Sequence, residues 1–239
     1  RLQLGLERKL LVAAVRSTAQ LSLLAIILTP VFSMARPALV LGLGALMIVL
    51  AGFEAARRAG HRYPGVGAVS VGAMGVAALT TTAFAVLIVL QSDPWWTPRY
   101  LIPLLGMILG NALTGVSVGL ERLLSGMTDR RAALEGRLAA GATWWEAVRP
   151  LAAHAIRTGM IPILNTMSVV GLITIPGMMT GQILAGADPG QAARYQLLIL
   201  FLIAAAVAMG TTAAVLLSAR MMFDADHRLR LEQLTRSDG

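Results

Sequence analysis

Several polar side chains lie inside otherwise apolar runs of this 239-residue chain, where each could bind a solute or a neighbouring helix. Arg16 and Gln20 are four residues apart and would share one face of a helix. Asn111 and Asn165 fall within two other apolar runs, and an unpartnered polar group in lipid is costly. The asparagines could instead bond across helices for structural reasons, and Arg16 could reach lipid phosphate. Taken together, the four residues predict a polar seam between helices.

The string GLITIPGMMTGQILAG, residues 171–186, combines a helix breaker with soft ligand groups. Pro176–Gly177 would interrupt a helix at membrane depth, and a broken helix is tolerated there only against protein or a cavity. Met178 and Met179 carry polarisable sulfur atoms that could contact a passing solute or a metal, although methionines in apolar segments usually serve packing. With Gln182, these residues predict a moving element that lines a substrate pathway.

The sequence argues against an enzyme or a metal centre. It has no cysteine, and its only lysine, Lys9, is not in a G-x-x-x-x-G-K-[ST] loop, so this chain cannot cradle ATP by itself. Its three histidines, His61, His154 and His227, are scattered through the polar links without the spacing of a zinc site. Glu121 borders such a link, where we expect a solvated charge. We therefore expect no catalytic residue, no metal site and no cofactor in this chain.

Composition indicates an all-α, polytopic membrane protein. Hydrophobic residues make up 56% of the chain, the mean hydropathy is +0.72, and charged residues make up 13%, about half the usual share. Six apolar segments approach the roughly 20 residues that a spanning helix needs. They run approximately over Leu11–Phe32, Ala38–Phe53, Gly65–Leu90, Tyr100–Leu120, Met160–Leu184 and Tyr195–Ala219. We expect them to form one transmembrane domain over residues 1–239.

Positive charges are distributed unevenly between the links. Of the 20 Lys and Arg residues, which include Arg1, only Arg36, Arg99 and Arg194 fall on one side. The positive-inside rule therefore places both ends of the chain and the long central link in the cytoplasm. This orientation explains the net charge of +8 without a nucleic-acid partner. The ring pair at residues 95–96, two tryptophans, then lies in the outer interfacial belt.

Small residues recur every four positions in the fourth apolar segment. They are Gly106, Gly110 and Thr114, with Gly115 and Gly119 offset from them. Such spacing lets helix backbones approach closely. The spacing favours ordinary helix packing within one subunit. The alternative is that this helix lies at a subunit interface or along a pore.

The central link, residues 121–158, is too charged for a bilayer and contains two helical pieces. The first, from about Asp129 to Ala140, stops at Gly141, a residue suited to a left-handed helix end. The second is a short helix that begins at Thr143, and Glu146 completes a capping box. We expect this short helix to project from the membrane.

Two adjacent tryptophans, Trp144 and Trp145, lie at the tip of this short helix and predict a docking site for another protein. The surrounding string, EGRLAAGATWWEA, has Glu135 followed six positions later by Gly141. It resembles the EAA-type cytoplasmic loop of ABC-transporter permeases. In those proteins a short coupling helix docks into a groove on the ATPase subunit.

Nearly the whole chain is similar to the iron-export permease family of bacterial ABC transporters (the Fet type), which has plant relatives linked to aluminium tolerance. The similarity lies in GMILGNALTGVSVGLERL, LEGRLAAGAT and RTGMIPILNTMSVVGLITIPGMMTGQILAGADPGQAARYQ. The loop departs from the family in lacking the usual Ile-x-Leu-Pro. Asn165 and Ser168 also stand where some relatives carry an acidic residue and a lysine. These departures bear on the transported species more than on the architecture.

The resemblance implies a permease homodimer in a bacterial inner membrane, with two copies of a separate ATPase that binds ATP and Mg. It implies a seventh membrane helix ahead of Leu11, with the N-terminus outside. It assigns ATPase coupling to Glu135, Gly141, Ala142, Thr143, Trp144, Trp145 and Glu146. Export of iron, a related metal or a metal complex is the favoured function. A channel or secondary transporter without ATP, and a membrane scaffold, are the alternatives.

Overall fold

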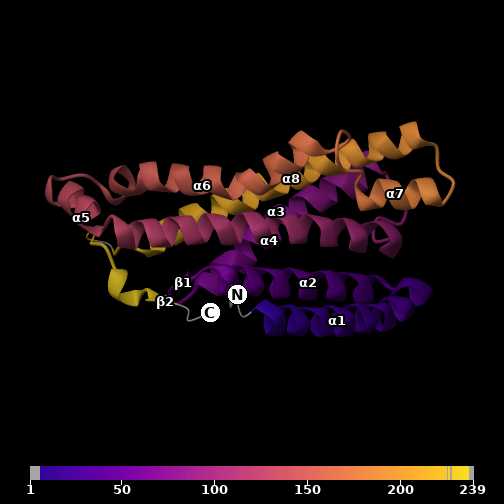
Figure 1. Cartoon of the computed structure of the whole chain (residues 1–239), viewed down its shortest axis with the longest axis horizontal. Coiled ribbons are helices and arrows are strands. Elements are labelled where there is room, and N and C mark those ends of the chain that lie inside the picture. The colour runs from indigo at the N-terminus through magenta and orange to yellow at the C-terminus, as the bar shows by residue number, and fades with distance from the viewer. Residues whose placement is uncertain (1–5, 225, 227, 237–239) are drawn as a thin grey trace.

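The computed structural model describes residues 6–224, 226 and 228–236, and it is almost entirely helical (Figure 1). Arg1 and His227 lie outside the described residues. The elements in chain order are α1 (Leu6–Met34), α2 (Pro37–Arg58), β1 (His61–Arg62), α3 (Val66–Phe84), the π-helix η1 (Ala85–Val89), α4 (Pro98–Asp129), α5 (Arg131–Ala139), α6 (Trp144–Val169), α7 (Gly177–Leu184), α8 (Pro189–Met221), the 3-10 helix η2 (Leu231–Gln233) and β2 (Thr235–Arg236). The all-α prediction is confirmed.

Within the residues that the structure describes, five helices are long and apolar enough to cross a membrane. They are Leu10–Met34 in α1, α2, Val66–Val89 across α3 and η1, α4, and α8. The sixth expected segment, Met160–Leu184, is not a continuous helix. α6 ends at Val169, the chain turns through Gly171 at φ +83°, and α7 begins after Pro176. The left-handed turn through Gly171 ends α6 seven residues before Pro176, and Pro176 then restricts the residue before it to an extended conformation ahead of α7.

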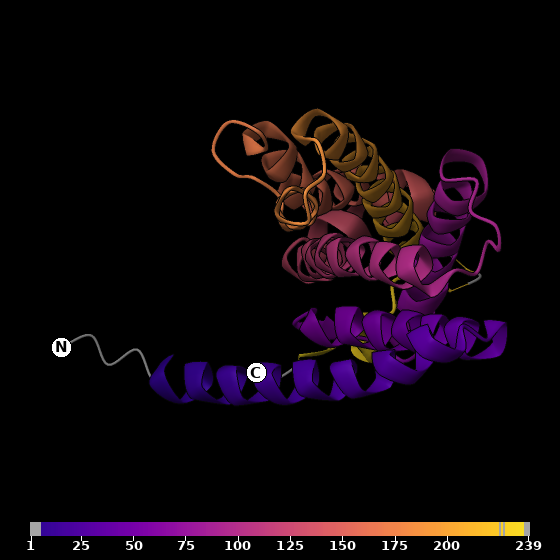
Figure 2. The same cartoon turned by 90° about the vertical axis from the view of Figure 1, so that its right-hand side faces the viewer.

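α4 is the central helix of the bundle and packs against α2, α3, α6 and α8. Figure 2, which looks along the bundle, shows α4 between α2 on one side and α6 and α8 on the other. Its side chains Ile108, Leu120, Leu123 and Leu124 are fully buried. With 32 residues α4 is about 48 Å long, so it exceeds a hydrocarbon core of about 30 Å and extends beyond it.

α4, α6 and α8 pack closely together at glycine residues, which have no side chain. A Cβ atom at Gly159 of α6 would lie 2.6 Å from the backbone oxygen of Gly115 on α4, and 2.6 Å from Cγ2 of Thr211 on α8. A Cβ atom at Gly119 would lie 2.8 Å from the same methyl group. Gly115 and Gly119 therefore pack within one chain, as their spacing favoured. Gly110 has nothing within 4 Å of its Cβ position, so this part of the stripe faces away from the core.

α1 crosses the edge of the bundle and its N-terminal part projects away from the other helices (Figure 2), and 0% of its apolar window is buried. Its C-terminal end is held by a small buried cluster of Val31 with Val40, Leu101 and Ile102. Most of its side chains are consequently exposed to lipid or to another chain.

Replacing Gly159 by alanine should force α6 away from α4, because the new methyl group would overlap a backbone oxygen. We expect a loss of about 1–3 kcal/mol, the usual cost of overpacking a core, measured as a lower unfolding temperature of the purified protein in detergent. Gly110→Ala is the matched control and should keep or slightly raise the unfolding temperature, since open space surrounds that position and alanine favours a helix over glycine. Equal unfolding temperatures for the two variants would contradict this packing.

Candidate functional site

The segments that carry the predicted coupling residues and the 171–186 string lie at opposite ends of the bundle (Figure 1). The end formed by α5, the start of α6 and the segment after α8 is called the α5 end. The end formed by α7, the start of α4 and the start of α8 is called the α7 end. Each end presents one candidate site.

A tight turn joins α5 to α6 at the α5 end. Gly141 adopts φ +90°, a left-handed conformation that glycine accepts without steric strain. The N–H groups of Gly141 and Ala142 donate to the carbonyls of Leu138 (3.0 Å) and Arg137 (3.1 Å). These bonds satisfy the last carbonyls of α5, so the predicted helix end at Gly141 is confirmed.

A capping box starts α6, as predicted. The Glu146 N–H donates to Thr143 Oγ1 (3.3 Å), and the Thr143 N–H donates to Glu146 Oε2 (2.8 Å). The bond from the Thr143 backbone lowers the pKa of the Glu146 carboxyl, because it stabilises the charged form. The cap fixes the position at which the turn becomes helix.

The prediction that this helix is short is wrong, because α6 runs from Trp144 to Val169 without a break. Its buried face packs into the core and sustains the helix through Pro150. The buried residues in this part are Ala147, Val148, Leu151, Ala152 and Ala155. With 26 residues α6 is about 39 Å long, so one helix connects the turn to the interior of the bundle.

The two tryptophans have different surroundings. The Trp144 ring lies 6.1 Å from the Phe223 ring, and the Arg220 guanidinium lies over it at 5.4 Å. Both partners lie at or just beyond the end of α8, so Trp144 fastens α6 to α8. Trp145 meets Trp144 edge-on at 5.8 Å and is 38% exposed. Trp145 is therefore the tryptophan of this pair that is open to a partner.

The chain after α8 folds back over the α5–α6 turn. The Arg230 N–H donates to the Met222 carbonyl (2.9 Å), and β2 pairs with β1. A cavity of about 480 Å³ lies between this segment and the turn, and it brings three predicted coupling residues together. It is lined by Glu135, Leu138, Gly141, Ala142, Asp226, Arg228 and Leu229. Sequence reasoning missed this segment, whose pairing with β1 has no local signature.

Glu121 is partly solvated, as expected, because its side chain is 41% exposed, and it also links two segments of the chain. The Gly60 N–H donates to its Oε2 (2.6 Å), and His61 Nδ1 lies 3.4 Å from its Oε1. Nearby, the buried Tyr63 hydroxyl donates to Ser218 Oγ (2.8 Å), and burial raises the pKa of Tyr63. These bonds tie the α2–α3 link to α4 and α8 at the α5 end.

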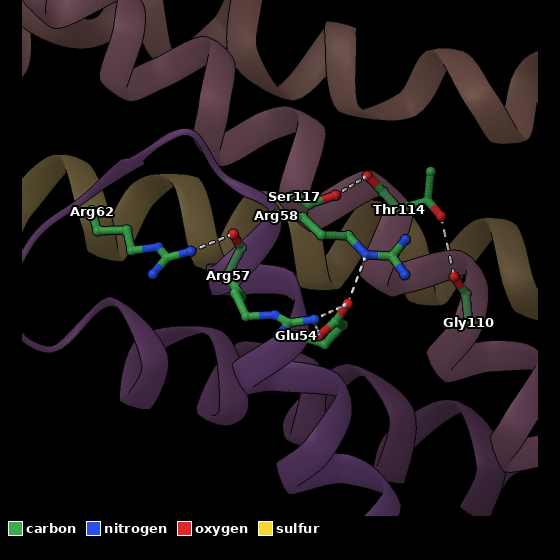
Figure 3. A network of polar contacts seen from close by, with 7 residues as sticks. All are labelled: Glu54, Arg57, Arg58, Arg62, Gly110, Thr114 and Ser117. Atoms are coloured by element: carbon green, nitrogen blue, oxygen red, sulfur yellow. Dashed lines mark hydrogen bonds and ion pairs between the residues drawn. The ribbon is translucent and has the colours of Figure 1, made fainter. Parts of the chain in front are cut away.

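Paired charges border the same end of α2. Glu54 lies 3.0 Å from Arg57 and 3.2 Å from Arg58, and Arg62 donates to the Arg57 carbonyl at 2.7 Å (Figure 3). Two guanidinium groups thus neutralise this carboxylate. On α4, Thr114 is satisfied by a bond within its own helix (Figure 3).

At the α7 end, a cavity of about 240 Å³ lies between η1, α4, α7 and α8. Its lining includes Met178 and Gln182, both predicted to line a pathway. It also includes Arg99, Tyr100, Met107 and Tyr195. Gln182 Oε1 is buried and has no hydrogen-bond partner among the described residues. An amide oxygen beside two thioether sulfurs can accept a hydrogen bond from a solute or contact a cation.

The start of α7 follows the predicted break. Pro176 precedes the first helical residue, Gly177, which is exposed. Met178 lines the cavity at the α7 end. Met179, the next residue, is half-buried.

The other predicted pathway residues lie elsewhere. Asn111 donates to the Met107 carbonyl of its own helix (2.9 Å). Arg16 and Gln20 on α1 and Asn165 on α6 are exposed. One chain therefore does not assemble these four residues into the expected polar seam. No cluster of three or more His, Cys, Asp or Glu side chains suited to a metal occurs in the part of the chain that the structure describes.

Residues 1–223 match the uncharacterised protein family UPF0014. The UPF0014 membrane protein slr1647 of Synechocystis is 36% identical over 226 residues, which cover 95% of this chain and 87% of that protein. The chain belongs to the UPF0014 family. No solved structure matches it.

Two further relatives of this UPF0014 chain have more informative names. The probable iron export permease protein FetB of Escherichia coli is 28% identical over 232 residues, 97% of this chain and 88% of FetB. Protein ALUMINUM SENSITIVE 3 of Arabidopsis thaliana is 32% identical over 197 residues, 82% of this chain and 71% of that protein. The resemblance to iron-export permeases and their plant relatives is thereby confirmed.

Trp144→Ala should destabilise the α5 end, because it removes the ring that joins α6 to Phe223 and Arg220. We expect a loss of about 2 kcal/mol, less than for a fully buried tryptophan, measured as a lower unfolding temperature in detergent. Trp145→Ala is the matched control and should change stability by less than about 0.5 kcal/mol, because its ring is exposed. The reverse order would show that Trp145 is the internal anchor.

Proposed function

We propose that this chain is the permease subunit of an ABC transporter and exports iron, a related metal or a metal complex, with ATP hydrolysed by a separate subunit. One observation carries the proposal: α6 begins beside an exposed tryptophan and continues unbroken into the bundle as far as Val169. Such a helix provides a rigid lever between a docked partner and a membrane pathway. The similarity to FetB, named as a probable iron export permease, supports the choice of cargo.

The packing of α6 determines which helices would move when a partner displaces Trp145. Because Gly159 lies against Gly115 and Thr211, α6 cannot shift without moving α4 or α8. Both of these helices line the cavity at the α7 end. Closure of the ATPase subunits on ATP would therefore displace the α5–α6 turn and change the shape of that cavity.

The cavity at the α7 end favours a complexed metal over a bare cation. Its only charged lining group within the described residues is the Arg99 guanidinium, beside the neutral groups of Gln182 and two tyrosines. A guanidinium repels a free cation and binds anionic oxygen ligands well. A metal held by carboxylate or phenolate groups therefore suits this lining.

We further propose a permease homodimer that binds two ATPase copies, which hold ATP and Mg. α1 is exposed along most of its length, and open space surrounds Gly110 on α4, so both surfaces are available to a second copy or to lipid. The arginine-rich α5 end would lie in the cytoplasm, with the protein in a bacterial inner membrane.

Trp145→Ala should weaken binding of the ATPase at least tenfold, because the variant removes the exposed aromatic anchor and leaves the contact of Trp144 with Phe223. The measurement is co-purification with a candidate ATPase subunit expressed together with this chain, and the ATPase rate of the complex in vesicles. Trp96→Ala, in the link at the α7 end, should leave both unchanged. Full binding and full ATPase coupling in Trp145→Ala would contradict the docking role.

Gln182→Trp should block the cavity at the α7 end and reduce ATP-driven iron transport into inside-out vesicles at least tenfold, while the ATPase remains bound. Leu184→Trp is the matched control on the same short helix and should transport normally, since Leu184 is 84% exposed. Ferrous ion alone and ferric citrate serve as the two cargoes, and the citrate complex should be preferred. Equal transport by both variants would remove the cavity from the pathway.

A further inference from the structure

A third cavity, of about 420 Å³, lies between α2, α3, η1 and α4 and shares no lining residue with the cavity at the α7 end. Its floor includes Ile48, Val86 and Leu105, each 8% exposed or less. Its rim includes Leu41, Leu79 and Leu87, which are 44%, 58% and 55% exposed. A buried apolar floor with an exposed leucine rim opens sideways toward the hydrocarbon of a bilayer.

One hydroxyl in this cavity has no partner. Thr82 lines the cavity and is 5% exposed, and its Oγ1 makes no hydrogen bond among the described residues. The preceding residues behave differently, because Thr80 donates to the Val76 carbonyl and Thr81 to the Ala77 carbonyl, each at 2.7 Å. A buried hydroxyl without a partner is unfavourable, so a ligand that supplies an acceptor would be bound more tightly.

The backbone next to Thr82 is also unusual. It enters the π-helix η1, in which the Leu90 N–H donates to the Ala85 carbonyl at 2.8 Å. Single π-helical turns are rare and occur frequently at functional sites. Thr82 lies seven residues before the end of η1 at Val89, about 10 Å along the helix from that end.

Trp95 contributes an aromatic ring to the cavity wall, and Arg36 precedes α2, one of the helices that line the cavity. Trp95 lines the cavity and is 41% exposed. Arg36, the residue before α2, lies five positions from Leu41, about 7.5 Å of helix. Arg36 is exposed, and no ion pair in the described part of the chain involves it. An indole and a guanidinium at this level suit the headgroup region of a lipid.

We propose that this cavity is a binding site for an acidic glycerophospholipid. One acyl chain fills the apolar floor, an ester carbonyl accepts a hydrogen bond from Thr82, and the phosphate lies near Arg36. A neutral apolar molecule would fill the floor but leave Arg36 unpaired, and a polar solute would not fit the leucine rim. The bound lipid would hold α2 and α3 against α4.

Fluorescence quenching in vesicles tests the proposal, because Trp95 lies in the cavity wall and bromine atoms on an acyl chain quench a neighbouring indole. The difference between the intact chain and Trp95→Phe isolates the signal of this ring. The probes are phosphatidylglycerol and phosphatidylcholine, each brominated on its acyl chains and diluted into the other lipid without bromine. Brominated phosphatidylglycerol should reach half-quenching at a mole fraction about three- to tenfold lower.

The variants distinguish a site from bulk lipid. Thr82→Val should raise the half-quenching mole fraction of the acidic lipid about three- to tenfold, the effect of one hydrogen bond, and Thr80→Val should not change it. Arg36→Gln should remove the preference for the acidic lipid, and this exposed position keeps the test valid if Thr82→Val does not fold. Equal quenching by the two lipids would overturn the proposal. Indistinguishable curves for Thr82→Val and Thr80→Val would overturn the assigned role of Thr82.

Discussion

The rest of the structure depends on the backbone contact between α4 and α6 at Gly115 and Gly159. No side chain separates the two helices there, and Thr211 of α8 closes the third side. In a membrane the hydrophobic effect does not drive helices together, so such close contact and dispersion must hold them. This contact and the burial of Ala147 to Ala155 make α6 part of the bundle over most of its length.

The two ends of the bundle are built on different principles. At the α5 end, polar and aromatic contacts join segments that are distant in sequence: Trp144 to Phe223, Glu121 to Gly60, and Tyr63 to Ser218. At the α7 end, the helical ladder is broken after Val169, and the cavity lining includes an unpartnered amide oxygen. This difference between the two ends fits the proposed coupling, in which force enters at the α5 end and changes the structure at the α7 end.

Local patterns in the sequence predicted local structure well. Thr143 and Glu146 form the capping box that their spacing indicates, Gly141 ends α5, and Pro176 marks the break before α7. Hydropathy identified five spanning helices but also counted Met160–Leu184 as one, because an average over a window does not register a broken hydrogen-bond ladder. The prediction of a short helix at Thr143 was wrong for a related reason. Its continuation depends on burial of Ala147 to Ala155 against other helices, which local signals do not contain.

Long-range contacts explain the remaining differences. Nothing near Trp144 in sequence distinguishes it from Trp145, and its partner lies beyond α8. The prediction of a polar seam rested on the free-energy cost of placing a polar side chain in lipid. Asn111 instead donates to a carbonyl of its own helix, and Arg16, Gln20 and Asn165 are exposed on the surface of the single chain. The unpartnered hydroxyl of Thr82 also follows only from the fold, since the adjacent Thr80 and Thr81 are satisfied.

The central claim is that the start of α6 is the docking point of an ATPase, and site-directed thiol labelling tests it most directly. The chain has no cysteine, so Arg149→Cys introduces a single reactive site one helical turn from Trp145 and keeps the tryptophan, and Leu184→Cys at the α7 end provides the control. The labelling rate with a water-soluble maleimide is compared with and without the ATPase. The account predicts that the ATPase protects position 149 at least tenfold and leaves position 184 unchanged. Equal labelling of position 149 in the isolated chain and in the assembled complex would contradict it.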